Sequence, residues 1–445
     1  MEMTNDPERA PIVIVGGGLA GLTCATILWR SGIPIQLFEK AASVGGRLST
    51  TRLAEGFQID QGFQVIFDAY PALRRHIDVT TIPHRSFTSG LSVWTGRRRV
   101  PLVHPLREPS GTLRTLTAPV ATFTDRLRLA AYALQVLRSP WESAAQADSA
   151  WSAGGRTIAQ ELVQIGLSSK FQRIVARPFW GGITLDPNLS TAAGIFRFTF
   201  QMLLKGRAIL PDEGAQALPR ALANSLPSEM LHVNSPVDHL HVENGHITGV
   251  VVSGSIVHAR TVVVATDALT AHALTGLDDI PTTGLGCITI FLATDQLVPS
   301  GPQLVVDGTG TRRVNHWALL SRVQPTYSTP GVHLVAGVLL GQEIWSWDDD
   351  TVVAVATRDA SIMLGHPENH WRPLAVVRTP FAQFAQPSGC FARQITPLTP
   401  IRGLYRCGEY LVDSSINGAI ISGERAAHAI ITDLAASSQP GEVVK

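Results

Sequence analysis

Lysine and cysteine are both scarce in this sequence of 445 residues. Arginine supplies most of the 36 basic residues, because only four lysines occur. The lysines are Lys40, Lys170, Lys205 and Lys445, and the four cysteines are Cys24, Cys287, Cys390 and Cys407. The wide spacing of the cysteines excludes a paired metal-binding or redox motif, and it fits a reducing cytoplasm.

Long apolar runs are lacking as well. The first ten residues are polar and slightly acidic, unlike the basic start of a signal peptide. The apolar stretch that follows is broken by glycines between Gly16 and Gly21, and no other stretch reaches the roughly 20 apolar residues that a membrane-spanning helix needs. We therefore expect a cytoplasmic protein without a membrane span. Peripheral contact with a membrane stays open, since it needs only an exposed apolar patch.

An excess of charge is also absent, because the formal net charge is +1. The chain therefore has no basic field that would attract nucleic acid. No Ser-His-Asp set or paired carboxylate is evident, so we assign no catalytic acid or base. His366 and His370 lie in a loop that proline interrupts, and we expect no metal site there. Strand alternation and a turn are expected to scatter a second group of histidines, at which we also expect no metal site. These histidines are His232, His239, His241 and His246.

Apolar residues, by contrast, are plentiful. Hydrophobic residues make up 45% of the chain and charged residues 16%, which is typical of a well-packed globular protein. The length is sufficient for two intertwined domains with a large buried core.

A nucleotide-binding pattern begins at residue 11. A β-branched strand (11–15) precedes the G-x-G-x-x-G sequence 16–21, a helix that runs to Arg30, and a second strand (33–38) that ends at Glu39. In such a pattern Gly16 permits the tight turn, Gly18 lets the backbone approach a pyrophosphate, and Gly21 lets the helix pack on the strand. The helix N-terminus suits the diphosphate.

The acidic residue at the end of the second strand indicates the kind of nucleotide. The Glu39 carboxylate can accept hydrogen bonds from both ribose hydroxyls of an adenosine, and it disfavours a 2′-phosphate and hence NADP. We place Leu19, Ala20 and Lys40 in the same binding set. These residues predict a dinucleotide site, but they do not distinguish FAD from NAD.

The next segment connects the sequence to a family. This segment contains Gly45-Gly46-Arg47. Together with the preceding strand, glycine turn and acidic residue, it resembles the N-terminal part of sequences in the superfamily of flavin amine oxidases, protoporphyrinogen oxidases and phytoene desaturases. The looser matches farther along are similar to the carotenoid-desaturase-like branch. The resemblance implies that Gly46 and Arg47 lie against the pyrophosphate and ribityl chain of FAD. A guanidinium can pair with two diphosphate oxygens.

Two further segments are similar to parts of this family. The segment 56–64 resembles the part that runs beside the isoalloxazine ring, which implies that Gly62, Phe63 and Gln64 face the flavin or substrate; the alternative is a β-hairpin with a glycine bulge. The segment 403–427 resembles the closing signature, with a strand, an acidic residue and a helix N-terminus near flavin N1 and O2. The resemblance adds Val237, whose backbone would touch the adenine, and, from the closing signature, Gly408, Glu409, Ile416, Asn417 and Ala419.

The predicted fold class is α/β. We expect a Rossmann-like, three-layer FAD-binding domain built from the discontinuous segments 1–75, 206–275 and 395–436. A substrate domain with a mixed sheet and helices, from segments 76–205 and 276–394, would be interleaved with it. Residues 437–445 are expected to form a flexible tail.

The substrate half leaves two alternatives open. Thr124–Val136 has near-helical apolar spacing, which favours a packed amphipathic helix over a membrane-facing one. Trp180, Phe196 and Phe198 could line an apolar tunnel, although core packing is the commoner fate of aromatic residues.

Two differences from the family pattern limit the reactions that we expect of this protein. Amine oxidases of this superfamily usually place a lysine on a substrate-domain strand near flavin N5, whereas the corresponding segment 285–294 has none. Ser388-Gly389-Cys390 faintly resembles a covalent attachment sequence, but it lies too close to Gly408, which favours non-covalent FAD. Only one G-x-G-x-x-G occurs, so we expect reoxidation by dioxygen, a quinone or another diffusible acceptor rather than by NAD(P).

Together these features predict an FAD-dependent oxidoreductase. It would dehydrogenate, desaturate or isomerise a small apolar substrate, for which an isoprenoid is one candidate. A flavin amine oxidase that releases peroxide is one alternative. A protein whose flavin is structural and redox-inactive is another.

Overall fold

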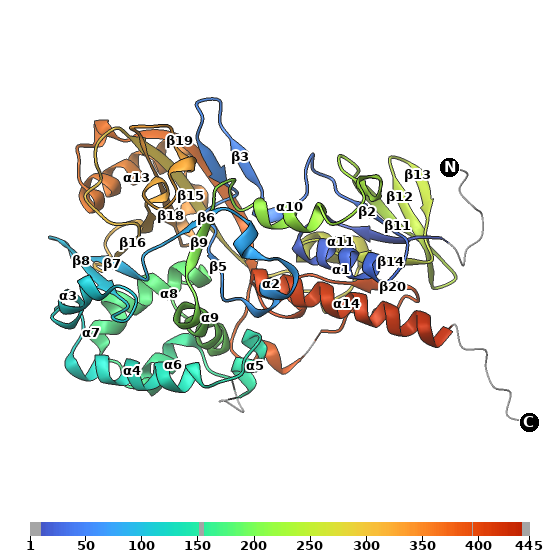
Figure 1. Cartoon of the computed structure of the whole chain (residues 1–445), viewed down its shortest axis with the longest axis horizontal. Coiled ribbons are helices and arrows are strands. Elements are labelled where there is room, and N and C mark those ends of the chain that lie inside the picture. The colour runs from blue at the N-terminus through green and yellow to red at the C-terminus, as the bar shows by residue number, and fades with distance from the viewer. Residues whose placement is uncertain (1–9, 151–154, 394, 438–445) are drawn as a thin grey trace, which may run out of the picture.

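The computed structural model describes residues 10–150, 155–393 and 395–437, and the structural statements below concern these residues. A parallel sheet lies toward one end of the long axis and a larger mixed sheet toward the other (Figure 1). The α/β class predicted from the sequence is confirmed.

The parallel sheet has five strands. In spatial order they are β10 (Leu231–His232), β2 (Ile35–Phe38), β1 (Ile12–Val15), β14 (Thr261–Val264) and β20 (Leu404–Arg406). Central strand β1 pairs with β2 and β14, and all of its residues are buried, as expected for a β-branched strand covered on both faces. The strands come from well-separated parts of the chain, so the predicted discontinuous assembly is present.

Helices and a small antiparallel sheet complete the three layers. The helical layer contains α1 (Leu19–Arg30), α14 (Ile416–Ser437), α10 (Ala217–Ala223) and α2 (Pro71–His76). Helices α1 and α14 approach each other closely at Gly423, where an added Cβ would lie only 2.3 Å from the Ala20 carbonyl oxygen. The lack of a side chain at Gly423 therefore permits this contact. The other layer contains β11 (Val237–Glu243), β12 (His246–Val252), β13 (Ser255–His258) and α11 (Ala268–Thr275).

The second region is built on a seven-stranded mixed sheet. In spatial order its strands are β19 (Arg372–Phe384), β15 (Gly284–Thr294), β18 (His333–Leu339), β17 (Val314–Ala318), β16 (Leu304–Asp307), β7 (Gly90–Trp94) and β8 (Arg99–Val103). Helix α13 (Asp349–Leu364) covers one face, where Trp317 and Ile344 are fully buried. The short helix α12 (Leu320–Val323) follows β17.

Two small sheets join the regions. One is the hairpin of β3 (Thr50–Arg52) and β4 (Gln58–Asp60), and the other contains β5 (Ile66–Phe67), β9 (Ala208–Pro211) and β6 (His84–Ser86). Strand β9 thus pairs with strands from both predicted domains, although the sequence-based division puts it in the FAD-binding one. That division stays a prediction. In the predicted tail, Ser437 ends α14, and residues 438–445 lie outside the described residues.

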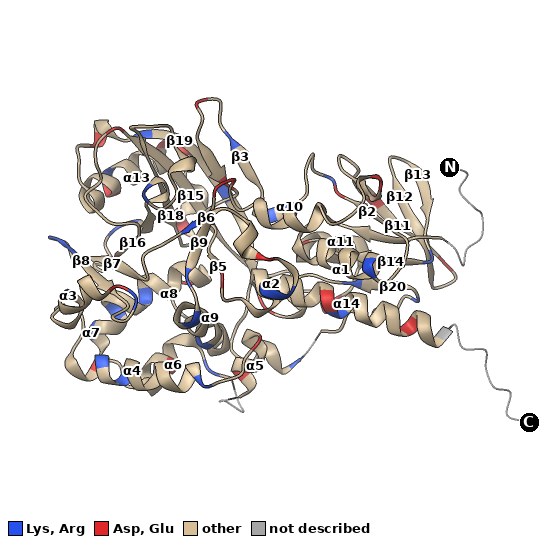
Figure 2. Cartoon of the chain, viewed as in Figure 1, with Lys and Arg blue, Asp and Glu red and all other residues tan. Residues whose placement is uncertain are grey.

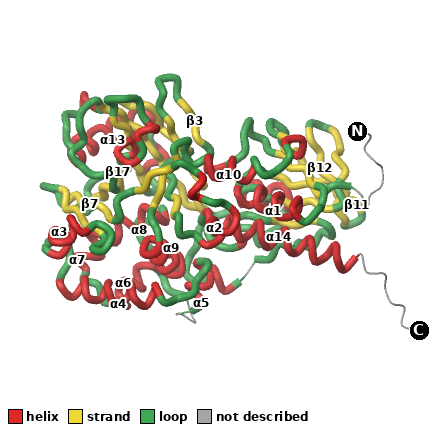
Figure 3. Tube along the Cα trace, in the orientation of Figure 1, coloured by secondary structure: helices red, strands yellow, loops and turns green. Residues whose placement is uncertain are grey.

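Helices gather on the other side of the mixed sheet (Figure 3). They are α3 (Thr112–Leu116), α4 (Phe123–Leu137), α5 (Ala144–Ser149), α6 (Ile158–Ile165), α7 (Ser169–Phe171), α8 (Arg177–Thr184) and α9 (Ala193–Lys205). A capping box fixes the start of α4, since Thr122 accepts from the Asp125 backbone N–H and the Asp125 carboxylate accepts from that of Thr122.

A buried ion pair ties these helices together. Arg197 of α9 donates two hydrogen bonds to Glu161 of α6, at 2.9 and 2.8 Å, and both side chains are at most 3% exposed. The Tyr132 hydroxyl of α4 also donates to Glu161, at 3.1 Å. Because the charges are removed from water, the packing of three helices depends on both partners being present.

Candidate functional site

A cavity of about 720 Å³ lies between the two regions. It opens at the carboxyl ends of the parallel strands, where Val15, Phe38 and Ala265 line it. Ligands of open parallel sheets bind at this edge. Residues of the mixed sheet and of helices α8 and α9 line its far side. Segments distant in the sequence therefore converge on one site.

The glycine turn between β1 and α1 forms part of the wall. Gly16 has φ +112°, and an added Cβ would lie 2.8 Å from the Ala265 carbonyl oxygen. Gly18 precedes the helix, and a Cβ there would meet nothing within 4 Å, so this backbone faces open space. A Cβ at Gly21 would lie 2.1 Å from the Gly16 carbonyl oxygen. Gly21 does not line the cavity. Its lack of a side chain instead lets helix α1 pack closely against the glycine turn.

Glu39 lies at the next corner of the cavity, with Lys40 and Val237. Its side chain is buried, and one carboxylate oxygen accepts the Gly17 N–H at 2.7 Å while the other accepts the Ala41 N–H at 2.8 Å. A carboxylate has about four lone-pair positions, so acceptor capacity remains. The backbone bonds hold this carboxylate in place at the cavity wall.

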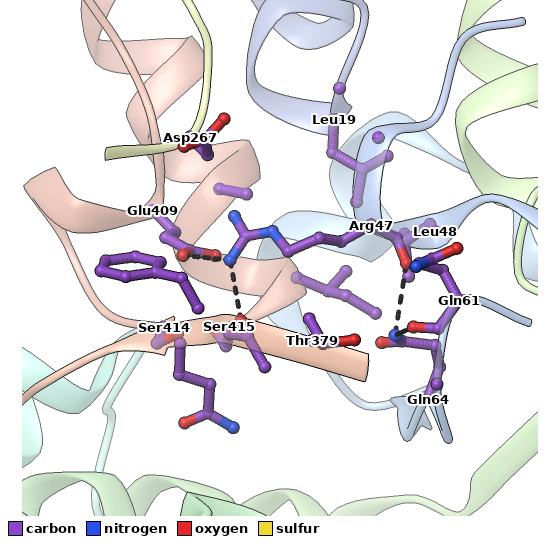
Figure 4. Close-up of a pocket in the computed structure, with 18 of the residues that line it drawn as sticks. Leu19, Arg47, Leu48, Gln61, Gln64, Asp267, Thr379, Glu409, Ser414 and Ser415 are labelled. Carbon is purple, nitrogen blue, oxygen red and sulfur yellow. Dashed lines mark hydrogen bonds and ion pairs between the residues drawn. The ribbon is translucent and has the colours of Figure 1, made fainter. Parts of the chain in front are cut away.

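Arg47 and Glu409 form an ion pair across the cavity (Figure 4). Nη1 of Arg47 lies 2.5 Å from the Glu409 carboxylate and donates to the Ala382 carbonyl oxygen at 2.9 Å. Burial raises the pKa of Glu409, although attraction to Arg47 partly lowers it. For Arg47, burial lowers the pKa, but the nearby carboxylate outweighs this effect and the net direction is upward. The guanidinium thus stays charged at the wall.

The segment after the β3–β4 hairpin runs along the cavity. Gly62 has φ +82°, a left-handed conformation that favours glycine. Gln64 donates to the Arg47 carbonyl oxygen at 3.2 Å and to that of Gln61 at 2.9 Å (Figure 4). Phe63 also lines the cavity. The hairpin interpretation and the cavity-facing interpretation are therefore compatible, because the hairpin ends before Gln61.

The C-terminal signature closes the site at the start of α14. Gly408, Ile416 and Ala419 line the cavity, as does Gly46 on the opposite wall. Asn417 does not: its side chain is fully buried, accepts the Ala72 N–H at 2.9 Å and donates to the Glu142 carbonyl oxygen at 2.8 Å. The cofactor-binding role of Asn417 stays a prediction, and its side chain is turned toward α2 instead of the cavity.

The comparisons with known proteins agree with this site. The sequence profile of the family described as flavin containing amine oxidoreductase matches residues 19–431. The chain belongs to this family. A flavin is therefore its cofactor class, and the glycine turn, the charged Arg47 and the buried Glu39 form a cradle that fits a dinucleotide.

Individual relatives of this flavin oxidoreductase are distant. A carotenoid phi-ring synthase of Streptomyces griseus is 34% identical, but the match covers only 22% of each chain. Among solved structures, an oxidoreductase from Methanosarcina mazei has a TM-score of 0.72 at 17% identity, covering 95% of this chain and all of the other. A putrescine oxidase with bound putrescine has a TM-score of 0.67 at 15% identity, covering 95% and 99%. The two structures show that the fold is shared.

The far end of the cavity of this flavin oxidoreductase is mainly apolar. Helices α8 and α9 contribute Phe179, Ile183, Ile195 and Phe198. Trp180 and Phe196, 4.6 Å apart between ring centroids, do not line it and pack in the core instead. The tunnel interpretation thus applies to only one of the three predicted aromatic residues.

Within the described residues, no group of three or more His, Cys, Asp or Glu could hold a metal ion. Cys390 lies against a separate small hollow beside Asp279 and Arg393, whereas Cys287 of β15 lines the main cavity. Burial raises the pKa of Cys287 to about 11, so its thiol stays protonated at neutral pH.

Several cavity residues were not predicted. Thr266 and Asp267 follow β14 at the carboxyl edge where Glu39 follows β2, so the parallel pattern alone could have indicated them. His316 lies in the segment Asn315-His316-Trp317, for which no function was assigned. Its importance depends on pairing with strands distant in sequence, which no local pattern shows.

Proposed function

We propose that this protein binds FAD non-covalently and dehydrogenates, desaturates or isomerises a small apolar substrate, of which an isoprenoid is the leading candidate. The observation that carries the proposal is that a single cavity has one polar, charged end and one apolar end. The first end has the glycine turn, Glu39 and the Arg47–Glu409 pair, and the second has the apolar side chains of α8 and α9. Bound FAD supplies the hydride acceptor.

The protein's own residues would bind, orient and exclude water. Glu39 would accept the ribose hydroxyls, Arg47 would pair with the diphosphate, and the start of α14 would place its N–H groups near the isoalloxazine ring. The apolar end would hold a C–H bond against the ring and keep water out. Dioxygen or a quinone would then be the electron acceptor, and a cytoplasmic location remains a prediction.

Two observations favour non-covalent attachment and an apolar substrate over an amine. Cys390 does not line the cavity, and the thiol of Cys287, which does, has a raised pKa and is a poor nucleophile. Strand β15 presents Cys287 to the cavity and contains no lysine. The carotenoid phi-ring synthase points toward isoprenoids, whereas the putrescine oxidase keeps an amine oxidase as the alternative.

Reconstitution tests the cofactor. The purified chain is expected to bind FAD but not NAD or NADP, to absorb at about 450 nm, and to release all its flavin on acid precipitation. Glu39→Gln should weaken FAD binding by about five- to tenfold, because a neutral amide replaces a charged acceptor. Glu55→Gln, at an exposed carboxylate away from the cavity, is the control. A colourless protein after reconstitution would refute the proposal.

Anaerobic reduction tests the reaction. Isoprenoid donors should bleach the flavin, while peroxide release upon addition of amines would favour the amine oxidase. Failure of every donor to bleach a fully loaded protein would favour the structural, redox-inactive flavin.

We also propose that the outward side of α3 and α4 contacts an anionic membrane. Helix α4 buries Tyr132 and Val136 in the core, as a packed amphipathic helix does, but several apolar side chains on its outward side are exposed. Asp125 is buried and accepts the Ser168 N–H at 2.7 Å. The apolar α3–α4 surface consists of Leu106, Leu113, Leu116, Phe123, Leu127, Leu134, Leu137 and Val163, all exposed, with Leu106 at 90% and Phe123 at 72%. No described helix is long and apolar enough to cross a membrane.

Helix α4 also carries two arginines, Arg126 and Arg128, whose positive charge suits anionic lipids. Arg126 bridges to the end of α3 through the Ala118 carbonyl oxygen at 2.7 Å, and Arg128 bonds the Gly166 carbonyl oxygen after α6, so the three helices form one face. Figure 2 shows basic residues along α4. Exposed apolar side chains next to basic ones are typical of helices that lie on a bilayer.

Vesicle binding tests this surface. The protein is expected to co-sediment with vesicles of phosphatidylcholine and phosphatidylglycerol, less so at high salt. The triple change Phe123→Ser, Leu127→Ser and Leu134→Ser should weaken binding by at least about tenfold. The control variant, Leu269→Ser with Ile256→Ser, changes exposed apolar residues elsewhere. Equal binding by the two variants would contradict the proposal.

A further inference from the structure

A histidine lies among the mainly apolar residues at the far end of the cavity. On the facing strands β16, β17 and β18, the cavity is lined by Leu304, Val306, His316 and Val338. His316 is 4% exposed, and its direct partners in the sheet are Val306 on one side and Val338 on the other. A histidine in this central, buried position needs a polar partner.

The hydrogen bonds around His316 identify its tautomer. The amide nitrogen of Asn315 donates to the Pro178 carbonyl oxygen at 2.8 Å, which fixes the orientation of the amide group. The same nitrogen lies 3.0 Å from Nδ1 of His316. An amide nitrogen only donates, so Nδ1 is the acceptor, and a neutral imidazole must then carry its proton on Nε2.

Nε2 of His316 is a buried donor. It is shielded from water and has no hydrogen-bond partner within the part of the chain that the structure describes. Burial lowers the pKa of His316 to about 4, so the ring is neutral near pH 7. A buried N–H without an acceptor is unfavourable, and an acceptor atom of a ligand in the cavity would satisfy it.

The position of the ring relates this donor to the reaction. The ring of Phe63 packs edge-on against that of His316, with 5.6 Å between the centroids. Phe63 belongs to the segment that we expect beside the flavin. On the other side, Gly182 of α8 allows close approach, since a Cβ there would lie 2.7 Å from Nδ1. His316 is thus held between the expected flavin wall and the apolar helices.

We propose that Nε2–H of His316 donates a hydrogen bond to an uncharged oxygen of the substrate. The substrate class is then an apolar molecule with a carbonyl or hydroxyl group near the reacting carbon, not a pure hydrocarbon and not an ammonium ion. An ammonium ion carries only donors and would face another donor here. This inference rests on the proposed function and specifies its substrate.

Ligand titration of the FAD-loaded protein tests the inference. The probes are geranylacetone, an isoprenoid ketone, and the hydrocarbon in which a methylene replaces its carbonyl group. Shifts in the flavin absorbance report binding of each. The wild-type protein is expected to prefer the ketone by about tenfold, the usual effect of one buried hydrogen bond.

Two variants separate hydrogen bonding from packing. His316→Phe should lose the preference by weakening only ketone binding, and His316→Gln, which keeps a donor, should retain part of it. A preference that is absent in the wild-type protein, or that survives in His316→Phe, would overturn the inference. So would a changed flavin spectrum in ligand-free His316→Phe, because the donor would then face the cofactor. Each variant must still bind FAD, which is measured by the strength of its flavin absorbance. If the wild-type protein binds FAD but shows no ketone preference, the inference fails; if it does not bind FAD at all, the proposed function fails.

Discussion

Gly18→Ala is expected to weaken FAD binding by about 1–3 kcal/mol, roughly 5- to 150-fold, while the chain still folds. An added Cβ at Gly18 meets no protein atom within 4 Å, and the residue has φ −77°, which alanine adopts readily. The methyl group would instead project into the cavity where the diphosphate is expected. Fluorescence titration with FAD and circular dichroism of the apoprotein measure the two effects separately.

Two other glycines provide the comparison for this prediction. Gly21→Ala should reduce stability as well as binding, because its Cβ would lie 2.1 Å from the Gly16 carbonyl oxygen and the backbone would have to move. Gly301→Ala should change neither, since its nearest neighbour would be 3.8 Å away and it does not line the cavity. Unchanged FAD affinity in Gly18→Ala would show that the diphosphate lies elsewhere.

Arg197→Met is expected to lower the free energy of unfolding by about 3–5 kcal/mol, because Glu161 would be left as a buried charge without its main partner. Arg197 is fully buried and Glu161 is 3% exposed. Chemical denaturation followed by fluorescence measures the change. Since three helices meet at this pair, we expect the helical side of the cavity to loosen first.

A second variant and the pH dependence control this prediction. Arg197→Met combined with Glu161→Gln should recover more than half of the lost stability, because the charge has been removed. Burial raises the pKa of Glu161, but its bonds to Arg197 outweigh this effect, so the pKa lies below its ordinary value. The pair therefore stabilises the fold above the ordinary carboxylate pKa of 4.5, and this stabilisation is lost as the pH falls through the lowered pKa. A single variant as stable as the wild-type protein would contradict the account.

The sequence predicted the structure best where residues close together in the chain also lie close together in the fold. The order of strand, glycine turn, helix and acidic residue predicted β1, α1, β2 and the position of Glu39, because each step is a constraint on neighbouring residues. It was less informative where side-chain direction depends on distant partners. The side chain of Asn417 is turned toward α2, and several apolar side chains of α4 are exposed, because partners distant in sequence set the orientation of each helix.

The amino-acid sequence by itself determined the nucleotide-binding pattern, the family and the α/β class, since these depend on residue types at short, fixed spacing. Only the tertiary structure decided which residues meet in the cavity. It brought Arg47 to Glu409 across 362 positions of the chain. It also put the donor of His316 among apolar neighbours and left several apolar side chains of α4 exposed. The physical reason is that charge pairing, burial and exposure are set by neighbours in space, and strand pairing between distant segments supplies those neighbours.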